Sequence, residues 1–327
     1  MPISFTETLV VGISSRALFD LEEENQLFQQ QGIVEYRKYQ KEREDTVLMP
    51  GTGFHLVQAL LNLNTLAKER LVEIIIMSRN SPETGIRVLN SLAHYKLDIT
   101  RSAFTGGEPL HDYIEAFEVD LFLSKEESDV QQVIDSKTAA AGLICAPPLG
   151  FQTETSTVRI AFDADAVLFS DESEQIFDSQ GLDAFHENER SNVNNPLKHG
   201  PYAKLLITLS KIQKKMNTGV ELSPLRLAIV TARNSPSHMR VINTLRDWDV
   251  YIDEAFFLGG LSKDKVLKAF KAHIFFDDQE AHLITAQSVV PSARVPYLST
   301  SPLHLKKEEL KLANDSTFEK NEIKKLT

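Results

Sequence analysis

The sequence predicts an α/β protein built from two related, doubly wound parallel-sheet domains. Short apolar runs alternate with stretches of helical periodicity, which is typical of a parallel sheet covered by helices on both faces. Two long segments also resemble each other at an offset of about 150 residues. The length of 327 residues suits two domains of about 150 residues each.

Each expected strand is a short apolar run, rich in β-branched residues and bounded by polar turns. Such runs are typical of strands that are buried on both faces. In the first half they are 9–13, 73–77, 119–123 and 141–145. In the second half they are 158–162, 225–230, 255–258, 274–276 and 294–298. Helical periodicity is clearest at 54–66, 202–212, 239–247 and 263–270.

The resemblance between the two halves consists of four blocks in the same order. Residues 11–36 align with 160–185 without a gap, so that Gly32 falls on Gly181. The other blocks pair 79–82 with 233–236, 87–90 with 240–243, and 106–107 with 259–260. We therefore predict an internal duplication. The expected parts are a first domain at 1–150, a second domain at 151–305 and a charged C-terminal tail at 306–327.

The amino-acid composition excludes several kinds of binding site and binding partner. The chain has 46 Asp and Glu against 35 Lys and Arg, a formal net charge of −11, which repels nucleic acid and anionic membranes. Its one cysteine, Cys145, excludes intrachain disulfides and cysteine-rich zinc sites. A signal peptide and a membrane-spanning apolar stretch are not expected. The sequence thus predicts a cytoplasmic protein, leaves an oligomer open, and requires a metal or a few placed cations for any phosphorylated ligand.

Polar side chains follow the expected strands of the second half, where parallel strands end at one edge of the sheet. Asp163 and Asp165 follow one strand, Thr231 ends the next, Lys263 opens a helix, and Asp277-Asp278 follow another strand. Clustered carboxylates repel one another unless a cation joins them, and Mg²⁺ prefers oxygen ligands. The pattern predicts phosphoryl transfer, in which one aspartate attacks phosphorus and a second, two residues on, transfers protons.

These motifs, in this order, resemble the haloacid-dehalogenase-like phosphatases. A closer resemblance, from about residue 8 to 300, is to the cytosolic 5'-nucleotidase I family, and segment 162–174 carries it most specifically. Other segments that carry it are 14–19, 195–197, 200–201, 230–233 and 273–279. The resemblance implies a Mg²⁺-dependent hydrolase that releases phosphate from nucleoside 5'-monophosphates, with AMP as the usual substrate.

The resemblance also implies roles for individual residues. Asp163 would be the nucleophile and Asp165 the general acid and base. Thr231 and Lys263 would bind phosphate, and Lys265, which opens the same helix, is the alternative lysine. The implied metal ligands are Asp163, the carbonyl of Asp165, Asp277 and, adjacent to them, Asp278.

The segment between Asp163 and Thr231 is longer than one crossover helix requires. We predict that residues 186–202 form a small cap insert over the site. The acidic residues 171–174 are interpreted as an exposed helix start or as part of the entrance. His238 and His282 have no metal-like spacing with other histidines, so we interpret them as solvent-facing.

The first half has lost every proposed catalytic position. In the alignment Asp163 falls on Ser14, Asp165 on Arg16 and Thr231 on Met77, so hydrolysis in the first half is not expected. Two interpretations stay open: a packing partner that closes the cleft, or a pocket that binds substrate or an effector nucleotide without cleaving it. Residues that would face such a ligand are Ser15, Arg16, Asn80, Thr105, Gly106, Gly107 and, from the second half, Arg233, for which a structural role is equally expected.

Other functions are also consistent with the sequence. A phosphatase for another small phosphate ester, such as a sugar phosphate, would use the same residues. A phosphotransferase would pass the phosphoryl group to a nucleoside instead of water. A non-catalytic nucleotide-sensing protein would be expected to lack the aspartates in both halves.

Overall fold

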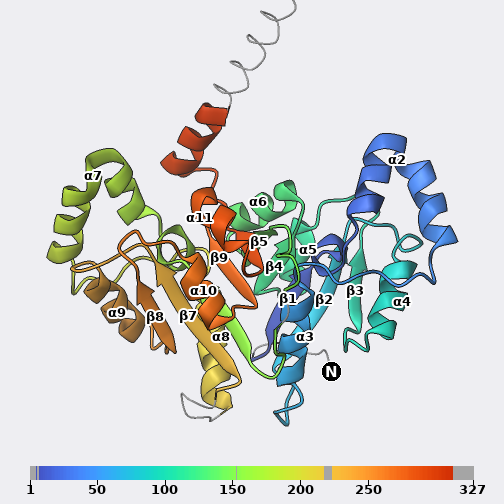
Figure 1. Ribbon diagram of the computed structural model, residues 1–327, viewed down its shortest axis with the longest axis horizontal. Coiled ribbons are helices and arrows are strands. Elements are labelled where there is room, and N and C mark those ends of the chain that lie inside the picture. Colours follow the sequence, from blue (N-terminus) through green and yellow to red (C-terminus); the bar gives the residue numbers. More distant parts are fainter. Residues whose placement is uncertain (1–4, 6, 152, 217–222, 312–327) are drawn as a thin grey trace, which may run out of the picture.

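The computed structural model describes residues 5, 7–151, 153–216 and 223–311. A ten-stranded sheet runs through the molecule with helices on both faces (Figure 1). The first half supplies β1 (Leu9–Ile13), β2 (Val72–Ser78), β3 (Arg101–Phe104), β4 (Leu121–Ser124) and β5 (Ala140–Ile144). The second half supplies β6 (Val158–Phe162), β7 (Leu225–Thr231), β8 (Glu254–Phe257), β9 (Ile274–Asp277) and β10 (Ser292–Arg294). The predicted α/β class is confirmed.

The two halves of the sheet have the same internal strand order. Across the sheet the order is β3-β2-β1-β4-β5-β10-β9-β6-β7-β8. Read from its outer edge inward, the first half is β3-β2-β1-β4-β5 and the second half is β8-β7-β6-β9-β10. In both halves the order is therefore third, second, first, fourth and fifth strand. Neighbouring strands are parallel within each half, whereas β5 and β10 pair in antiparallel fashion at the junction, with Ala293 opposite Ile144. One cluster of buried apolar side chains includes residues of both halves.

Helices connect the strands and cover the sheet. In the first half they are α1 (Ser15–Leu18), α2 (Glu22–Glu42), α3 (Phe54–Leu63), α4 (Ile86–His94), α5 (His111–Ala116) and α6 (Glu127–Ser136). In the second half they are the π-helical turn η1 (Ala164–Leu168), α7 (Glu172–Ser191), α8 (Ala203–Lys215), α9 (His238–Asp247), α10 (Asp264–Phe270) and α11 (Glu280–Ala286). Residues 302–311 form a further helix beyond the sheet, and the rest of the predicted tail, 312–327, lies outside the described residues.

Two long kinked helices, α2 and α7, rise at opposite ends of the molecule (Figure 1). Gly32 (φ 79°, ψ −175°) bends α2, and Gly181 (φ 83°, ψ −177°) bends α7. This backbone conformation is almost restricted to glycine, because a Cβ atom would be strained there. The segment that leaves the sheet in the second half begins at Glu172, the first residue of α7. The cap insert predicted at 186–202 therefore contains only the end of α7 and the loop after it.

Three local predictions differ from the structure. The strand expected at 294–298 is observed as β10 at Ser292–Arg294, because Pro296 has no backbone N–H for a ladder hydrogen bond. Strand β3 was not expected, because its residues Arg101–Phe104 are partly exposed and do not form an apolar run. The gap-free alignment of 11–36 with 160–185 is also wrong at one point, because η1 contains five residues where α1 contains four. The extra residue accompanies Ala166 in a left-handed conformation (φ 56°), and such π-type insertions are frequent at functional sites.

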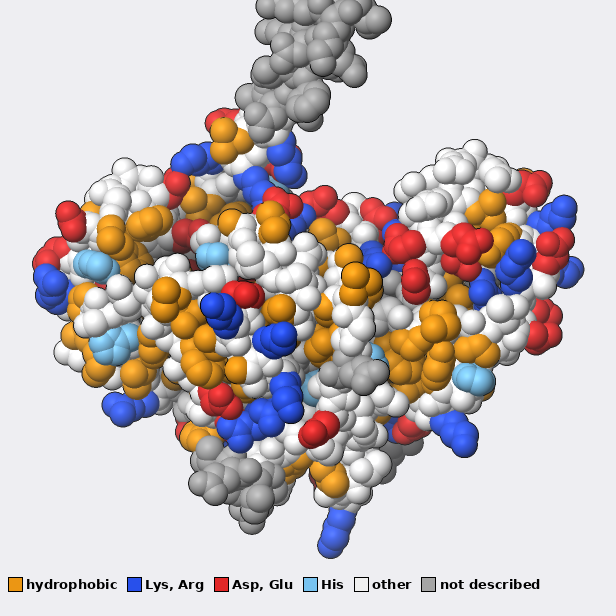
Figure 2. Space-filling view, in the orientation of Figure 1, with side chains coloured by type: hydrophobic (Ala, Val, Ile, Leu, Met, Phe, Trp, Pro, Cys, Tyr) orange, Lys and Arg blue, Asp and Glu red, His pale blue; other side chains and the backbone are white. Residues whose placement is uncertain are grey.

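Acidic and basic side chains are interspersed over the face shown in Figure 2. Among the described residues, no helix is long and apolar enough to cross a membrane.

Candidate active site

Four of the predicted residues meet at the carboxyl edge of the second half of the sheet. Asp163 follows β6, Thr231 ends β7, Asp277 ends β9, and Lys263 precedes α10. Lys263 Nζ lies 3.0 Å from Asp163 Oδ1 and 2.7 Å from Asp277 Oδ2. All four residues are buried. Asp163, Lys263 and Asp277 thus form one compact group, and Thr231 ends β7, the strand beside β6.

Backbone hydrogen bonds fix the direction of these side chains. The Asp163 amide donates to the Phe276 carbonyl at 2.8 Å, so the β6–β9 pairing continues to the first residue after the strand. The amide of Gln279 donates to Asp277 Oδ1 at 2.8 Å, and the amide of Arg233 donates to Thr231 Oγ1 at 3.2 Å. Each strand therefore ends in a turn that holds its polar side chain at the sheet edge.

The protonation of the group follows from burial and from Lys263. Burial raises the pKa of Asp163 to about 6; the charge of Lys263 opposes this shift, and Asp277 and Asp165 add to it. Burial alone would raise the pKa of Asp277, but Lys263 and His282 together hold it below its usual value. Burial would lower the pKa of Lys263, but the two carboxylates raise it instead. The lysine is therefore charged and compensates one of two nearby carboxylates.

A second acidic pair lies beside this group. Tyr297 donates its hydroxyl to Glu174 Oε1 at 3.1 Å or to Asp278 Oδ2 at 2.5 Å, and it has one proton to share between them. Glu174 Oε2 and Asp278 Oδ1 are buried and accept no hydrogen bond from the described residues. Burial and the charges of Asp165 and Asp163 raise the pKa of Glu174 to about 7. Burial, Glu174 and Asp277 raise the pKa of Asp278 well above its usual range.

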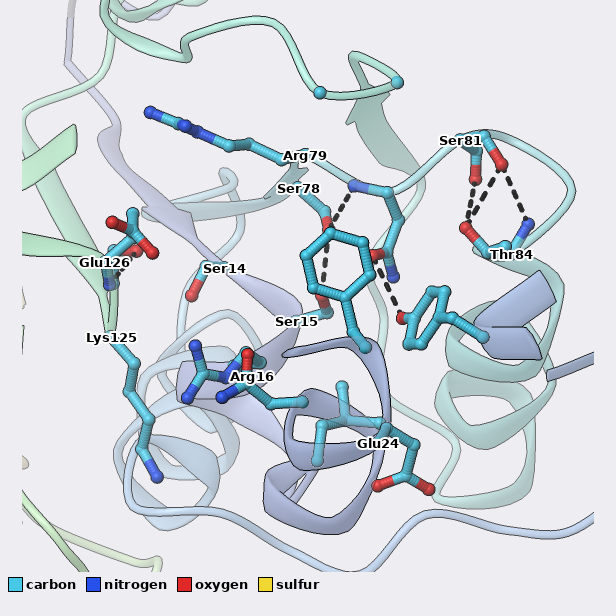
Figure 3. A pocket seen from close by; sticks show the side chains of 18 of the residues that line it. Ser14, Ser15, Arg16, Glu24, Ser78, Arg79, Ser81, Thr84, Lys125 and Glu126 are labelled. Atoms are coloured by element: carbon cyan, nitrogen blue, oxygen red, sulfur yellow. Dashed lines mark hydrogen bonds between the residues drawn. The ribbon is translucent and has the colours of Figure 1, made fainter. Parts of the chain in front are cut away.

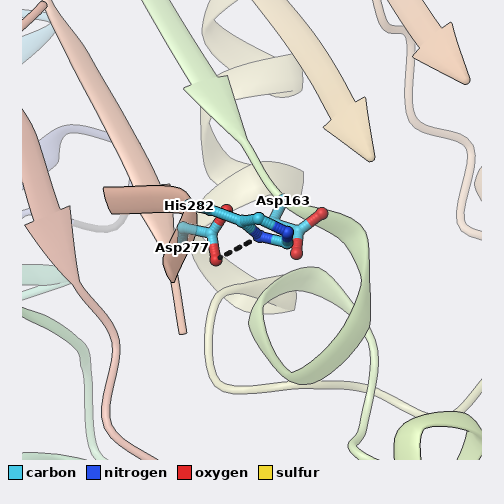
Figure 4. Close-up of side chains that lie close together, drawn as sticks. All are labelled: Asp163, Asp277 and His282. Carbon is cyan, nitrogen blue, oxygen red and sulfur yellow. Dashed lines mark hydrogen bonds and ion pairs between the residues drawn. The ribbon is translucent and has the colours of Figure 1, made fainter. Parts of the chain in front are cut away.

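The donor chemistry fits a divalent cation. Asp163, Asp277 and His282 each offer one ligand atom, and these atoms lie within 4.8 Å of one another (Figure 4). The orphaned oxygens of Glu174 and Asp278 require a proton or a cation, because buried carboxylates without donors are costly. The interpretation of His282 as solvent-facing is wrong, since its Nδ1 lies 3.2 Å from Asp277 Oδ2.

Asp165 is held away from this group by a buried network of charges. Both of its oxygens accept hydrogen bonds from Arg233, Nε at 2.7 Å and Nη2 at 2.6 Å. Arg233 also pairs with Glu189 of α7, which in turn binds Arg240 at 2.9 Å. The side chains of Arg233 and Glu189 are 1% and 0% exposed. Helix α7 is thereby tied to the loop that carries Asp165.

Sequence reasoning missed several members of this site. Glu174 was interpreted only as part of an exposed helix start or of the entrance, although it lies within the segment that carries the family resemblance most specifically. Tyr297 and Glu189 gave no motif signal, because their roles depend on contacts between distant segments. The carbonyl of Tyr297 also accepts a hydrogen bond from Gln131 of α6 at 2.9 Å, so the first half contacts the segment that supports the acidic pair.

The predicted residues of the first half lie around a cavity of about 480 Å³ (Figure 3). Among its lining residues are Ser15, Arg16, Asn80, Gly106 and Gly107. Thr105 is not among them, and its hydroxyl donates to the Glu108 carbonyl. The strand register also corrects the alignment: with Ile13 opposite Ile76 and Phe162 opposite Ile229, the first-half residue that corresponds to Thr231 is Ser78 rather than Met77.

Comparison with known proteins places this chain in a family. Residues 1–302 match a model of the 5'-nucleotidase family. The chain belongs to the 5'-nucleotidase family. It is 36% identical over 288 residues to cytosolic 5'-nucleotidase 1B of Homo sapiens, an alignment that covers 85% of this chain and 47% of the human protein. The chain thus spans about half the length of that relative. A search of solved structures gave no match.

The Arg233–Glu189–Arg240 network predicts a large stability effect. Glu189→Gln should lower the free energy of unfolding by about 3 kcal/mol or more, because it leaves two arginines beside a neutral amide in a buried site. Urea denaturation followed by circular dichroism measures this. Glu187→Gln on the same helix is the control, since its pair with Arg190 is largely exposed and should contribute about 0–1 kcal/mol. Equal losses in the two variants would contradict the interpretation.

Glu174 predicts a pH-dependent stability. Glu174 has a folded pKa of about 7 against an unfolded value of 4.5, so its ionisation costs stability. This cost is absent well below pH 4.5, grows between pH 4.5 and 7, and is constant above pH 7. In EDTA, Glu174→Gln should therefore be more stable than wild type by about 1–3 kcal/mol at pH 8, with a smaller difference at pH 5.5.

Denaturation curves at both pH values test this prediction. Glu172→Gln is the matched control, because Glu172 is an exposed residue of the same helix and its substitution should change stability by less than about 1 kcal/mol at either pH. A wild-type protein as stable as Glu174→Gln at pH 8 would show that Glu174 carries no such cost.

Proposed function

We propose that this protein is a Mg²⁺-dependent 5'-nucleotidase that hydrolyses nucleoside 5'-monophosphates, with AMP favoured, to nucleoside and phosphate. Membership of the 5'-nucleotidase family supports the reaction class. The observation that carries the proposal is the contact of Lys263 with both Asp163 and Asp277. It joins a carboxylate nucleophile, a phosphate-binding cation and a metal ligand within one buried group.

The proposed reaction has two steps. In the first, an Asp163 oxygen attacks phosphorus, the bond from phosphorus to the 5'-oxygen breaks, and Asp165 gives that oxygen a proton. In the second, Asp165 takes a proton from water, the water oxygen attacks the acyl-phosphate at phosphorus, and Asp163 is released as a carboxylate. Thr231 donates a hydrogen bond to a phosphoryl oxygen, and Lys263 compensates the charge of phosphate and nucleophile.

Arg233 acts in this scheme as a positioning residue. Both oxygens of Asp165 accept hydrogen bonds from it, so we propose that substrate binding turns Asp165 out of this pair before proton transfer. Glu189 and Arg240 hold the guanidinium while Asp165 moves.

The same residues suit Mg²⁺. Asp163, the carbonyl of Asp165 and Asp277 would hold the ion, with Asp278 adjacent and His282 within reach. When bound, the ion supplies positive charge that offsets the carboxylates and the phosphate. Lys263 alone compensates too little negative charge for a phosphate dianion to enter beside Asp163, Asp277 and the acidic pair.

We further infer that the two halves arose by duplication. The matching strand orders and the matching kinks at Gly32 and Gly181 support this inference. The proposed boundaries are 1–150 for the first domain, 151–305 for the catalytic domain and 306–327 for the tail. In the catalytic domain α7 acts as the cap, because its Glu189 reaches the Asp165 loop through Arg233.

We also propose a cellular location and binding partners for the protein. The human relative is named as cytosolic, and we propose the cytoplasm for this chain. Its substrate would be a nucleoside monophosphate, and its negative charge disfavours nucleic acid and membrane surfaces.

Phosphate release across a substrate panel tests the proposal. The panel contains nucleoside monophosphates and sugar phosphates, each with Mg²⁺ and with EDTA. We expect AMP turnover in Mg²⁺ and none in EDTA, and we expect Asp163→Asn to lower kcat by at least about 10³-fold, because the amide is a poor nucleophile.

The control is Lys41→Ala, which alters an exposed residue of the first half away from the catalytic group and should leave kcat unchanged. Full turnover by Asp163→Asn, or equal turnover in EDTA, would contradict the proposal. A preference for sugar phosphates over every nucleotide would move the enzyme to another substrate class.

A further inference from the structure

The cavity of the first half lies where the catalytic group lies in the second half. Its residues come from the carboxyl ends of β1, β2 and β4 and from the kinked helix α2. Figure 3 shows Ser14, Ser15 and Ser78 close together, with Arg16 and Lys125 beside them. The hydroxyls of Ser15 and Ser78 are hydrogen-bonded at 2.9 Å. Both halves therefore present polar side chains at the same edge of their sheets.

The chemistry of the two edges differs at four of five paired positions, and a hydroxyl is kept at the fifth, where Ser78 stands for Thr231. Strand ends and helix starts assign the pairs Asp163 to Ser14, Thr231 to Ser78, Lys263 to Leu110, Asp277 to Ser124 and Asp278 to Lys125. The first-half cavity retains hydroxyl groups but has lost the carboxylate nucleophile and the acidic metal ligands. It can bind a phosphate without hydrolysing it.

The charge of the cavity favours an anion. Arg16 Nη2 lies 3.1 Å from Glu22 Oε2, and Lys125 Nζ lies 2.8 Å from Glu22 Oε1, so two cations share one carboxylate. Arg16 Nε is buried and has no hydrogen-bond partner among the described residues. The Glu22 side chain is 44% exposed, so it can swing into solvent when an anion takes its place.

Two further ion pairs lie at the cavity. Arg79 is paired with the buried Asp129 at 2.5 Å, and Glu24 is paired with Arg87 at 2.5 Å. These pairs leave Arg16 and Lys125, together with Arg37, which also lines the cavity, as the cations available for a ligand. Cations of this kind bind phosphate by charge-assisted hydrogen bonds and need no metal.

The opposite wall of the cavity is apolar and aromatic. Phe28, Ile33 and Tyr36 of α2 line it, and the rings of Phe28 and Tyr36 meet edge to face at 5.7 Å. Phe28 and Ile33 are 45% and 46% exposed, so a planar ring can cover them. The Tyr36 hydroxyl donates to Asn80 Oδ1 at 3.2 Å, which leaves the Asn80 amide group to bind a ligand.

We propose that this cavity is a second, metal-independent site that binds a nucleoside monophosphate without cleaving it. The phosphate contacts Ser14, Ser15, Arg16 and Lys125, and the base packs on Phe28 and Tyr36. A volume of about 480 Å³ lies within the range of small-molecule sites. The site is distinct from the catalytic group of the second half and does not depend on hydrolysis there.

Binding stoichiometry of AMP tests the proposal. Asp165→Asn is used as the background so that AMP is not consumed while the side chains proposed to hold Mg²⁺ stay in place, and binding is measured by equilibrium dialysis with Mg²⁺ and with EDTA. We expect one AMP per chain in EDTA and two in Mg²⁺. Adding Arg16→Ala should weaken the EDTA-resistant binding at least 10-fold and leave the Mg²⁺-dependent binding intact, which shows that the variant is folded.

Two further variants sharpen the assignment. Phe28→Ala should weaken AMP binding in EDTA but not the binding of inorganic phosphate, because it removes a surface for the base. Lys41→Ala, an exposed residue of the same helix outside the cavity, is the control and should change neither.

No AMP binding in EDTA, or EDTA-resistant binding that Arg16→Ala leaves unchanged, would overturn the proposal. Binding in EDTA without any Mg²⁺-dependent binding or turnover would instead contradict the proposed catalytic function and leave the second site standing.

Discussion

The contact of Lys263 with two buried carboxylates is the interaction on which the candidate site of the second half depends. Asp163 follows β6 and Asp277 ends β9. Because these two strands are parallel neighbours, the two residues lie side by side whatever the path of the chain between them. Without Lys263 the two charges would repel each other in a site closed to water. With it, one negative charge remains, and Glu174 and Asp278 add more nearby. The fold thus maintains an excess of negative charge at this edge, which the proposed Mg²⁺ would compensate so that a phosphate can enter.

The two halves show how one sheet architecture carries opposite charge at the same place. In the second half, Asp163, Asp165, Glu174, Glu189, Asp277 and Asp278 face Lys263, Arg233 and Arg240, an excess of three acids. In the first half Arg16 and Lys125 share Glu22, an excess of one cation. The strand order is the same in both, so side chains at a few strand ends set what each edge binds. Tyr297 joins the halves, because its hydroxyl contacts the acidic pair and its carbonyl contacts α6.

Much of this arrangement could be predicted from the sequence, for physical reasons that also mark the limits. Buried parallel strands are continuous apolar runs, so 9–13 and 158–162 were predicted with their observed bounds. Strand β3 lies at a sheet edge and lacks such a run. Parallel topology predicted that Asp163, Thr231 and Asp277 lie at one edge of the sheet, whereas the choice of Lys263 over Lys265 rested on the family resemblance. Glu174, Glu189 and Tyr297 could not be predicted in this way, because their contacts depend on how α7 and the segment after β10 pack.

The direct test of the central claim is to find where the phosphoryl group rests during turnover. A single turnover of AMP labelled in its phosphate is quenched in acid, and the protein is digested and its labelled peptides are identified. The account predicts an acyl-phosphate on Asp163, with no label on the corresponding first-half peptide that contains Ser14. Label on Ser14, or complete turnover without any labelled protein, would contradict it.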